Sequence, residues 1–347
     1  MNIEVEIVYR TEFLSLKEDW NRLYAGEDMS YFQSFPWNEL VLSCMPKDTR
    51  YYEASFAVVK TDGQICLIAP FWVVKKQYRW INKPQITLLG SVGWSDYCNF
   101  IYDEWQDECA DALFEKVKAY YGVETFHFSN LKETTHLYSY ILSHFAVDKD
   151  IQGLCVALSI PQSMDEYHSI LSKHAKQNIR TALNRLERDG VEYTISFDDK
   201  SVNREKLWAL RAVRAEKRLQ EELRQIGAAR RIRRFLKDRF LSIPICSYNP
   251  IIDDKESAFL TIKHGEELMA FFCYGKDELR NEIVVMAAGI DEKYKFYSPG
   301  MVLWYSFIQD AIANKTLRKI DFTRGNEDYK KMLGGSESSI HFVDIRL

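Results

Sequence analysis

The sequence lacks the features that mark several large classes of protein. Its seven cysteines are scattered, odd in number and without a Cys-x-x-Cys pair, which indicates free thiols in a reducing compartment rather than disulfides or a zinc site. The longest apolar run, residues 65–74, is about half of what a membrane span needs. The first ten residues contain no apolar segment typical of a signal peptide. These absences predict a cytoplasmic protein without a transmembrane segment.

Motifs of common cofactor and metal sites are missing as well. There is no glycine-rich phosphate loop, no dinucleotide fingerprint, no Gly-x-Ser-x-Gly and no His-Glu-x-x-His. The seven histidines show no metal-ligand spacing. We therefore expect neither a metal ion nor a tightly bound cofactor, and these absences fit a reaction in which a group is transferred from an activated donor.

What the sequence does contain is a long chain with unevenly distributed charge. A length of 347 residues predicts two domains of about 150 residues each. Residues 173–239 carry 19 Lys and Arg against 10 Asp and Glu, a net +9, so that the rest of this −4 chain carries −13. This asymmetry favours an anionic partner such as phosphates, tRNA or an acidic lipid surface. Solvated helices with Glu–Arg pairs explain the same counts equally well.

The order of predicted elements repeats. Each half has helices, then two strands around a tight turn, then strand, helix and strand; Asp62-Gly63 marks the first turn. The pattern predicts two mixed α/β units at 1–150 and 151–334. The sequence also predicts strands at 97–101 and 191–197 and helices at 168–188 and 227–241.

Residues 281–335 form the stretch around which the second half is organised. A strand is predicted at 281–290, a helix at 299–314 and a second strand at 318–322. At the start of the helix Ser298 suits the N-cap, Pro299 the first position, and Gly300 close approach of a ligand. The amide groups and dipole of such a helix start attract an anion. An ordinary helix start is the alternative.

Several of these motifs resemble one known family. They are similar to the BioF2-like or CelD-like acetyltransferases of the GNAT superfamily, which are related to the FemAB peptidoglycan aminoacyltransferases, and the matches span about residues 30 to 335. The matching segments are residues 171–190, Ala288-Gly289-Ile290-Asp291, Tyr297-Ser298-Pro299-Gly300, Asp321-Phe322-Thr323-Arg324-Gly325, Tyr329-Lys330 and, in the first half, Phe32-Gln33-Ser34, Ala69-Pro70-Phe71 and Ser95-Asp96-Tyr97. The resemblance implies tandem GNAT folds, each a twisted mixed sheet flanked by helices. It also implies a degenerate first unit on the acceptor side and a C-terminal strand at 335–347 that can return to this first unit. In a GNAT fold two parallel strands splay apart to admit the acyl donor.

The resemblance also implies roles for particular residues. Lys330 would neutralise an oxyanion or a donor phosphate, and Tyr329 would pack against the acyl group or protonate the leaving group. A Lys330→Ala variant would then keep its fold and lose turnover. In the first unit, Asp96 is the candidate general base, although a turn aspartate more often caps an N–H. The remaining candidates are Tyr97, Trp94 and Tyr297 for substrate.

Cationic residues are the other candidates for donor binding, besides Ser298 and Gly300. Arg324 directly follows a strand and would fork onto a phosphate or carboxylate, unless Asp321 holds it in an internal ion pair. Lys173, Lys176 and Arg180 share one helix face and would clamp a diphosphate or a tRNA backbone.

Taken together, the expected function is an N- or O-acyltransferase that acts without a covalent enzyme intermediate. Its donor would be an acyl-CoA or an aminoacyl-tRNA, and its acceptor a small molecule or a sugar-linked compound of cell-envelope or exopolysaccharide metabolism. Only Gly300 remains of the family's usual glycine-rich pyrophosphate turn, which counts against acyl-CoA. The alternative is a non-catalytic module that binds tRNA or an anionic membrane surface through the basic segment. No DNA partner is expected.

Overall fold

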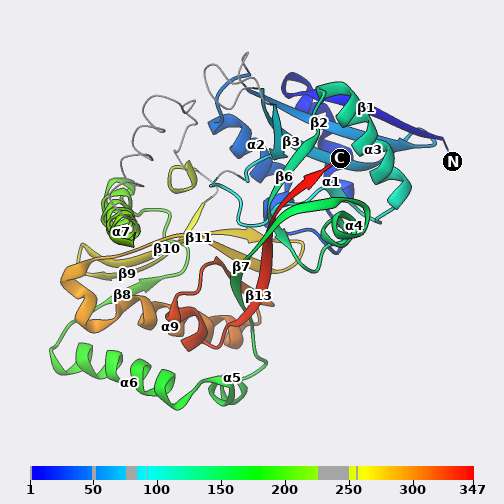
Figure 1. The fold of residues 1–347 in the computed structure, drawn as a ribbon. Helices are drawn as coiled ribbons and strands as arrows, with labels where there is room; N and C mark the ends of the chain where they lie inside the picture. Colours follow the sequence, from blue (N-terminus) through cyan, green and yellow to red (C-terminus); the bar gives the residue numbers. More distant parts are fainter. Residues whose placement is uncertain (1, 49–51, 76–83, 92, 226–249, 255–256) are drawn as a thin grey trace. The chain divides into compact units, whose positions relative to one another are not determined.

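The computed structural model describes residues 2–48, 52–75, 84–91, 93–225, 250–254 and 257–347 (Figure 1). These residues form two compact units. The first contains residues 2–153 and 339–347, and the second contains residues 154–225 and 250–338. The helix predicted at 227–241, with its four arginines 230, 231, 233 and 234, lies outside the described residues.

The first unit is built on a mixed sheet. Its neighbouring strands are antiparallel from β1 to β3, and β3 is antiparallel to β4, whereas β4 and β6 are parallel through Ile86–Phe126 and Thr87–His127. In sheet order, the strands are β1 (Ile3–Tyr9), β2 (Tyr52–Thr61), β3 (Gln64–Val74), β4 (Gln85–Leu88), β6 (Thr125–Lys132), β13 (Ser336–Arg346) and the first part of β7 (Ala146–Ser159), with β5 (Ile101–Tyr102) paired to β3.

Short helices accompany this sheet. They are the 3-10 segments η1 (Arg10–Leu16) and η2 (Tyr31–Gln33) and the α-helices α1 (Lys17–Leu23), α2 (Phe35–Cys44), α3 (Asp107–Tyr121) and α4 (His136–His144). The strand predicted at 97–101 was wrong for most of its length, because only Ile101 and Tyr102 are in β5.

The second unit repeats the same order of pairing. Its strands, in sheet order, are β8 (Thr194–Ser196), β9 (Ala258–His264), β10 (Glu267–Asp277), β11 (Glu282–Ile290), β12 (Lys319–Arg324) and the end of β7. Three antiparallel pairs are followed by the parallel pair β11–β12 and the antiparallel pair β12–β7. The helical segments are α5 (Met164–Ile170), α6 (Lys173–Arg188), α7 (Arg204–Gln225), η4 (Pro250–Ile252), η5 (Glu292–Tyr297), α9 (Pro299–Asn314) and α10 (Asp328–Met332). The repeated topology confirms the prediction of tandem mixed α/β units.

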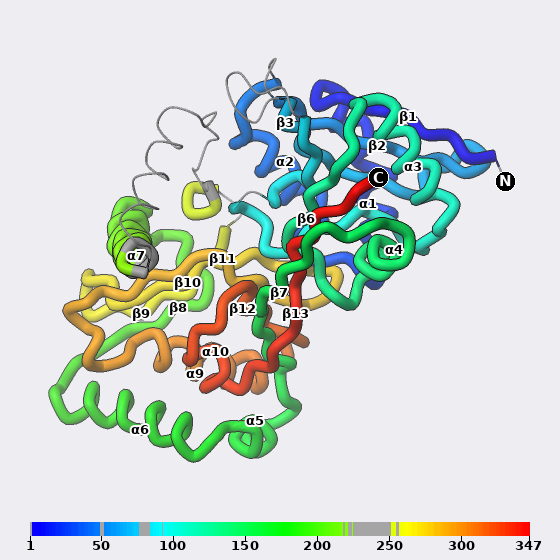
Figure 2. The backbone as a smooth tube through the Cα atoms, in the orientation of Figure 1, coloured from blue at the N-terminus to red at the C-terminus, as the bar shows by residue number. Residues whose placement is uncertain are grey.

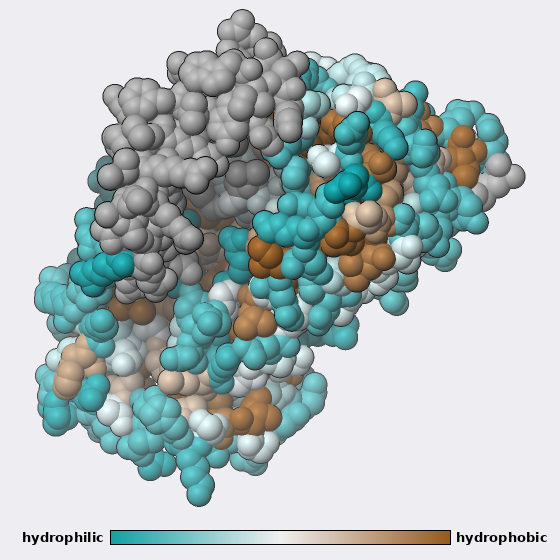
Figure 3. Space-filling model, viewed as in Figure 1, coloured by the Kyte–Doolittle hydropathy of each residue, from teal (hydrophilic) through white to brown (hydrophobic). Residues whose placement is uncertain are grey.

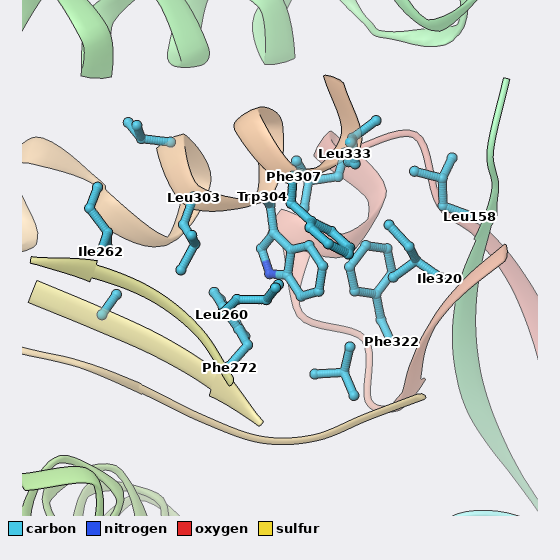
Figure 4. Packing of buried hydrophobic residues seen from close by; sticks show 14 of the residues in the cluster. Leu158, Leu260, Ile262, Phe272, Leu303, Trp304, Phe307, Ile320, Phe322 and Leu333 are labelled. Atoms are coloured by element: carbon cyan, nitrogen blue, oxygen red, sulfur yellow. The ribbon is translucent and has the colours of Figure 1, made fainter. Parts of the chain in front are cut away.

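The core of the second unit lies between α9 and its sheet. Trp304 is fully buried, with its ring centroid 4.7 Å from that of Phe272 on β10 and 5.0 Å from that of Phe322 on β12. Figure 4 shows these rings meeting among Leu260, Leu303 and Ile320. Burial of three aromatic side chains and their aliphatic neighbours fixes α9 over the sheet, and with it the position of the start of α9.

Two of the remaining local predictions were wrong in extent. Residues 168–188 do not form one helix: Leu171 is extended (ψ 132°), and the Ser172 side chain accepts the amide N–H of Ala175 at 3.0 Å, so that a new helix, α6, begins there. The strand predicted at 191–197 is only three residues long, Thr194–Ser196.

Candidate functional site

The parallel strands β11 and β12 separate part of the way along. They pair through only three residue pairs, the last being Val284 with Asp321, although β11 continues to Ile290 and β12 to Arg324. Beyond the last pair, Thr323 has a positive φ of 58°, and its hydroxyl donates to the Val285 carbonyl at 2.9 Å. The Thr323 side chain thus makes the hydrogen bond between the two strands just beyond the last backbone pair. The backbone pairing of the two strands therefore ends before either strand does, and their separation beyond that point stays a prediction.

A cavity of about 400 Å³ lies in the second unit, beside the first turn of α9. Part of its wall is apolar, and Arg185, Arg214 and Lys295 add positive charge. Among the described residues that line it, none is a carboxylate. The complete lining is Asn178, Thr181, Arg185, Arg214, Phe272, Ile290, Lys295, Ser298, Pro299, Gly300, Met301, Tyr329 and Met332. This combination suits a ligand with an anionic part and an apolar part.

The first turn of α9 forms one wall of this cavity. Ser298 is the N-cap residue, but it is in the left-handed conformation (φ 49°, ψ 51°) and its side chain makes no capping hydrogen bond, so the predicted side-chain cap was wrong. Its carbonyl instead accepts the N–H of Met301 at 2.9 Å. Pro299 occupies the first turn as predicted and has no N–H to offer. Gly300 has no carbonyl partner four residues back within the helix, so the turn keeps its positive end.

Gly300 also determines how closely the cavity wall packs. A Cβ atom added to this buried residue would lie 3.2 Å from Cδ1 of Ile290 and 3.4 Å from Cζ of Phe272. Both neighbours line the cavity. A side chain at this position would therefore displace the wall.

The cation on α6 is held in a fixed orientation. Arg185 Nη1 donates to the Phe296 carbonyl at 2.7 Å, and its guanidinium lies 4.3 Å from the centroid of the Phe296 ring. Lys295, the neighbour of Phe296 in η5, is largely exposed and lies 3.9 Å from Glu292. Arg185 is thus anchored by both backbone and ring, whereas Lys295 extends into solvent.

Behind the cavity, a carboxylate joins two cations. Arg214 Nη2 lies 3.0 Å from Glu327 Oε1, and Lys330 Nζ lies 2.9 Å from Glu327 Oε2. Burial raises the pKa of the Glu327 carboxyl, but the Lys330 ammonium and, more weakly, Arg214 outweigh it and hold this pKa below its ordinary value. Glu327 is therefore ionised at neutral pH.

Lys330 lies inside the protein, with a side chain that is 3% exposed. Its ammonium also donates to the backbone carbonyls of Thr323 (3.3 Å), Arg324 (2.9 Å) and Gly325 (3.4 Å). These acceptors and Glu327 take up all three N–H donors. Tyr329, not Lys330, lines the cavity. The chain passes from β12 through α10, which carries both residues, into β13 (Figure 2).

The other cations predicted for donor binding are not among the residues that line this cavity. Arg324 is exposed, and Asp321 uses Oδ1 to accept the Thr323 N–H at 2.8 Å. Lys173 and Arg180 are exposed on α6, and the visible surface over α6 is mostly hydrophilic (Figure 3).

The cavity-lining residues of α6 were missed. Asn178, Thr181 and Arg185 have helical spacing and flank the buried stripe of Ala175, Ile179, Ala182 and Leu186. At 100° per residue, this row lies about 120° around the helix from the Lys173 and Arg180 side. Their position beside the buried stripe could have indicated these residues in the sequence. The prediction instead relied on charge, which pointed to the solvent-exposed side of the helix.

The predicted acceptor residues lie in the first unit. Trp94 and Tyr97 are buried, and Asp96 is half-buried. Lys132 Nζ lies 4.0 Å from the centroid of the Tyr97 ring, and the Tyr97 carbonyl accepts from Gln33 Nε2 at 3.1 Å. These three therefore belong to a different unit from the cavity.

Tyr297, the remaining substrate candidate, is in the second unit. Its hydroxyl donates to Asp189 at 3.2 Å, and it is not among the cavity-lining residues. Within the described parts of the chain, no group of three or more His, Cys, Asp or Glu is placed to bind a metal ion. None of the helices described combines the length and apolarity needed to cross a membrane.

Two units of one topology, with a cationic cavity at the start of the helix that connects the parallel strands β11 and β12, define the class as a tandem GNAT-type α/β protein. Residues 173–331 match the family described as Acetyltransferase (GNAT) domain. This match covers the second unit, which therefore carries a GNAT acetyltransferase domain, and the protein is an acyltransferase. A search of the curated proteins finds no match.

Solved structures share the fold over both units. FemX aligns with a TM-score of 0.62 at 12% identity, covering 99% of this chain and 97% of FemX. A tandem GNAT protein of the clavulanic acid biosynthesis pathway aligns at 0.51 and 11% identity, covering 99% and 98%. The C-terminal domain of a putative lysylphosphatidylglycerol synthetase from Agrobacterium fabrum aligns at 0.53 and 10% identity, covering 96% and 92%. At these identities the likeness concerns the fold alone.

Proposed function

We propose that the cavity of the second unit binds an activated acyl donor, with the anionic part of the donor at the start of α9. The observation that carries this proposal is the grouping of Arg185, Arg214 and Lys295 around that helix start, with no carboxylate among the described lining residues. A guanidinium forks onto phosphate oxygens, and the positive end of the helix adds to the attraction. The apolar wall formed by Phe272, Ile290 and the two methionines suits the acyl part.

The proposed reaction is direct transfer to an amine or hydroxyl. The acceptor attacks the donor carbonyl, a tetrahedral oxyanion forms, and the leaving group departs with a proton. Tyr329 lines the cavity and is the proposed source of that proton. Asp96 remains the proposed base for the acceptor. Oxyanion stabilisation by Lys330 is not part of this proposal, because that ammonium already has four acceptors.

The two candidate donors are acyl-CoA and aminoacyl-tRNA. The turn before α9 offers few backbone donors, because η5 uses the Ser298 N–H for the Lys295 carbonyl and Pro299 has none. Side-chain cations therefore carry the anion binding in our proposal. One structural neighbour is a tandem GNAT protein solved without acetyl-CoA, and the name of another denotes a lysylphosphatidylglycerol synthetase. We therefore keep both donor types in the proposal.

For the acceptor, we propose a compound of cell-envelope or exopolysaccharide metabolism, such as a nucleotide-linked or lipid-linked sugar. Family resemblance supports this proposal, and with it a cytoplasmic reaction that contacts the membrane only at its surface. The basic face of α6 would assist with an anionic partner.

Isothermal titration with acetyl-CoA and with aminoacyl-tRNA tests donor binding. We expect saturable binding of at least one donor, weakened about tenfold or more in Arg185→Ala because a charge-assisted pair is lost. Arg188→Ala is the matched control, since Arg188 lies on the same helix, pairs with Asp189 and is absent from the cavity lining. Equal affinities of Arg185→Ala and the wild type would refute the assignment. Polyanion binding without any acyl transfer would favour the non-catalytic alternative.

A further inference from the structure

Phe296 is an exposed aromatic residue at the edge of the candidate site. It belongs to η5 and stands two residues before the N-cap of α9, and its side chain is 51% exposed. One part of the ring is supported by the Arg185 guanidinium, 4.3 Å from the ring centroid, and the Tyr297 ring contacts it at a centroid distance of 5.3 Å and an angle of 78°. The ring is thus oriented by its neighbours while half of it faces solvent.

The same contacts tie this ring to the cavity. Arg185 lines the cavity, and its Nη1 donates to the Phe296 carbonyl at 2.7 Å. Lys295, adjacent in the chain, also lines the cavity. A flat apolar surface therefore adjoins a pair of cations and a helix N-terminus. This is the arrangement needed by a ligand with an aromatic base and phosphates a short distance apart.

We infer that Phe296, backed by Arg185, is a stacking platform for the purine base of the donor. The ligand class is an adenosine that carries phosphate, which occurs both in coenzyme A and at the 3′ end of tRNA. This inference rests on the proposed function, since it assigns the nucleotide part of the same donor. Stacking with a base gives the exposed ring a role, and the cations beside the ring would bind the phosphates. Arg185 serves both parts, because its guanidinium supports the ring and reaches the cavity.

The first arm of the test uses coenzyme A and 4′-phosphopantetheine, which lacks the adenosine and the two phosphates that the adenosine carries in coenzyme A. We expect Phe296→Ala to weaken coenzyme A binding about tenfold, since loss of one stacked base has an effect of this order, and to leave 4′-phosphopantetheine binding unchanged. Phe296→Trp should restore the affinity, because tryptophan keeps a flat ring. Tyr193→Ala, which removes another partly exposed ring of the second unit, is the control and should change neither affinity.

The second arm uses a short RNA hairpin that ends in CCA and the same hairpin without the terminal adenosine. A Phe296-dependent difference in this arm alone identifies RNA as the source of the base, and one in the first arm alone identifies coenzyme A. Equal weakening of 4′-phosphopantetheine and coenzyme A by Phe296→Ala would overturn the inference, because the ring would then only hold Arg185. If Phe296→Ala binds all probes as tightly as the wild type does, the inference is also overturned, but the proposed function is unaffected. If the wild type binds none of the probes, the proposed function fails with it.

Discussion

Replacing Lys330 with methionine removes a buried ammonium while keeping a side chain of similar length. The change leaves three backbone carbonyls without their donor and separates Glu327 from one of its two cations. Loss of one partner of a buried ion pair costs about 3 to 5 kcal/mol. Because Glu327 is 27% exposed and keeps Arg214 at 3.0 Å, we take the lower end, about 3 kcal/mol.

A loss of this size lowers the melting temperature of a domain of 150 to 250 residues by roughly 6 to 12 °C. Thermal unfolding followed by circular dichroism at pH 7 measures it. Lys331→Met is the matched control: the neighbouring side chain is 46% exposed and pairs with Glu337 at 2.6 Å, so its loss should cost less than about 1 kcal/mol. The sequence-based expectation that Lys330→Ala keeps the fold intact is thereby revised, because burial makes Lys330 part of the fold.

The pH dependence provides a second measurement on the same variant. Since the pKa of Glu327 is held below its ordinary value of 4.5 in the folded protein, its ion pair contributes stability above about pH 4.5. That contribution is lost as the pH falls through the lowered pKa. The difference in stability between the wild type and Lys330→Met should therefore narrow below pH 4.5. If Lys330→Met keeps the melting temperature of the wild type but its turnover falls more than a hundredfold, this reasoning is refuted. Lys330 would then act in catalysis rather than in stability.

Three further variants test the surroundings of this ion pair. Gly325→Ala should lower the free energy of unfolding in urea by about 2 kcal/mol, because φ is +118° there and an added Cβ would clash with Glu327 Oε2. Thr323→Val should cost about 1 kcal/mol in the same assay, because it removes the hydroxyl bond to Val285 and keeps the branched shape. Gly300→Val should weaken donor binding in calorimetry by displacing the cavity wall, while Gly300→Ala has a smaller effect.

Elements fixed by local chemistry could be predicted closely. The helix predicted at 299–314 is α9, Pro299–Asn314, because a proline suits its first turn and the residues that follow are apolar. The hairpin at Asp62-Gly63 followed from two residues that tolerate positive φ, and both have it, at 50° and 87°. The repeated order of elements predicted the tandem units.

Properties set by distant partners could not be predicted. The sequence shows Lys330 as a helical lysine near the C-terminal end, the kind of residue that is usually solvated. Its burial depends on carbonyls directed inward by Thr323 and Gly325, two residues with positive φ, and on Glu327. The cavity itself combines residues of α6, α7, η5, α9 and α10, which are far apart in the sequence. The prediction from charge density fell on the exposed face of α6, because charged residues are as common on a solvent-exposed surface as in a binding site.

Residues 321–330 form a closely connected set of contacts, although Tyr329 is the one described residue among them that lines the cavity. The backbone reverses at Thr323, which aims two successive carbonyls at the Lys330 ammonium, and Gly325 leaves room for Glu327 to meet the same ammonium. Glu327 then uses its other oxygen to hold Arg214. Glu327 thus links the turn that ends β12 to a cation of the cavity through two ion pairs, so an anion bound at Arg214 competes with Glu327 for the same guanidinium.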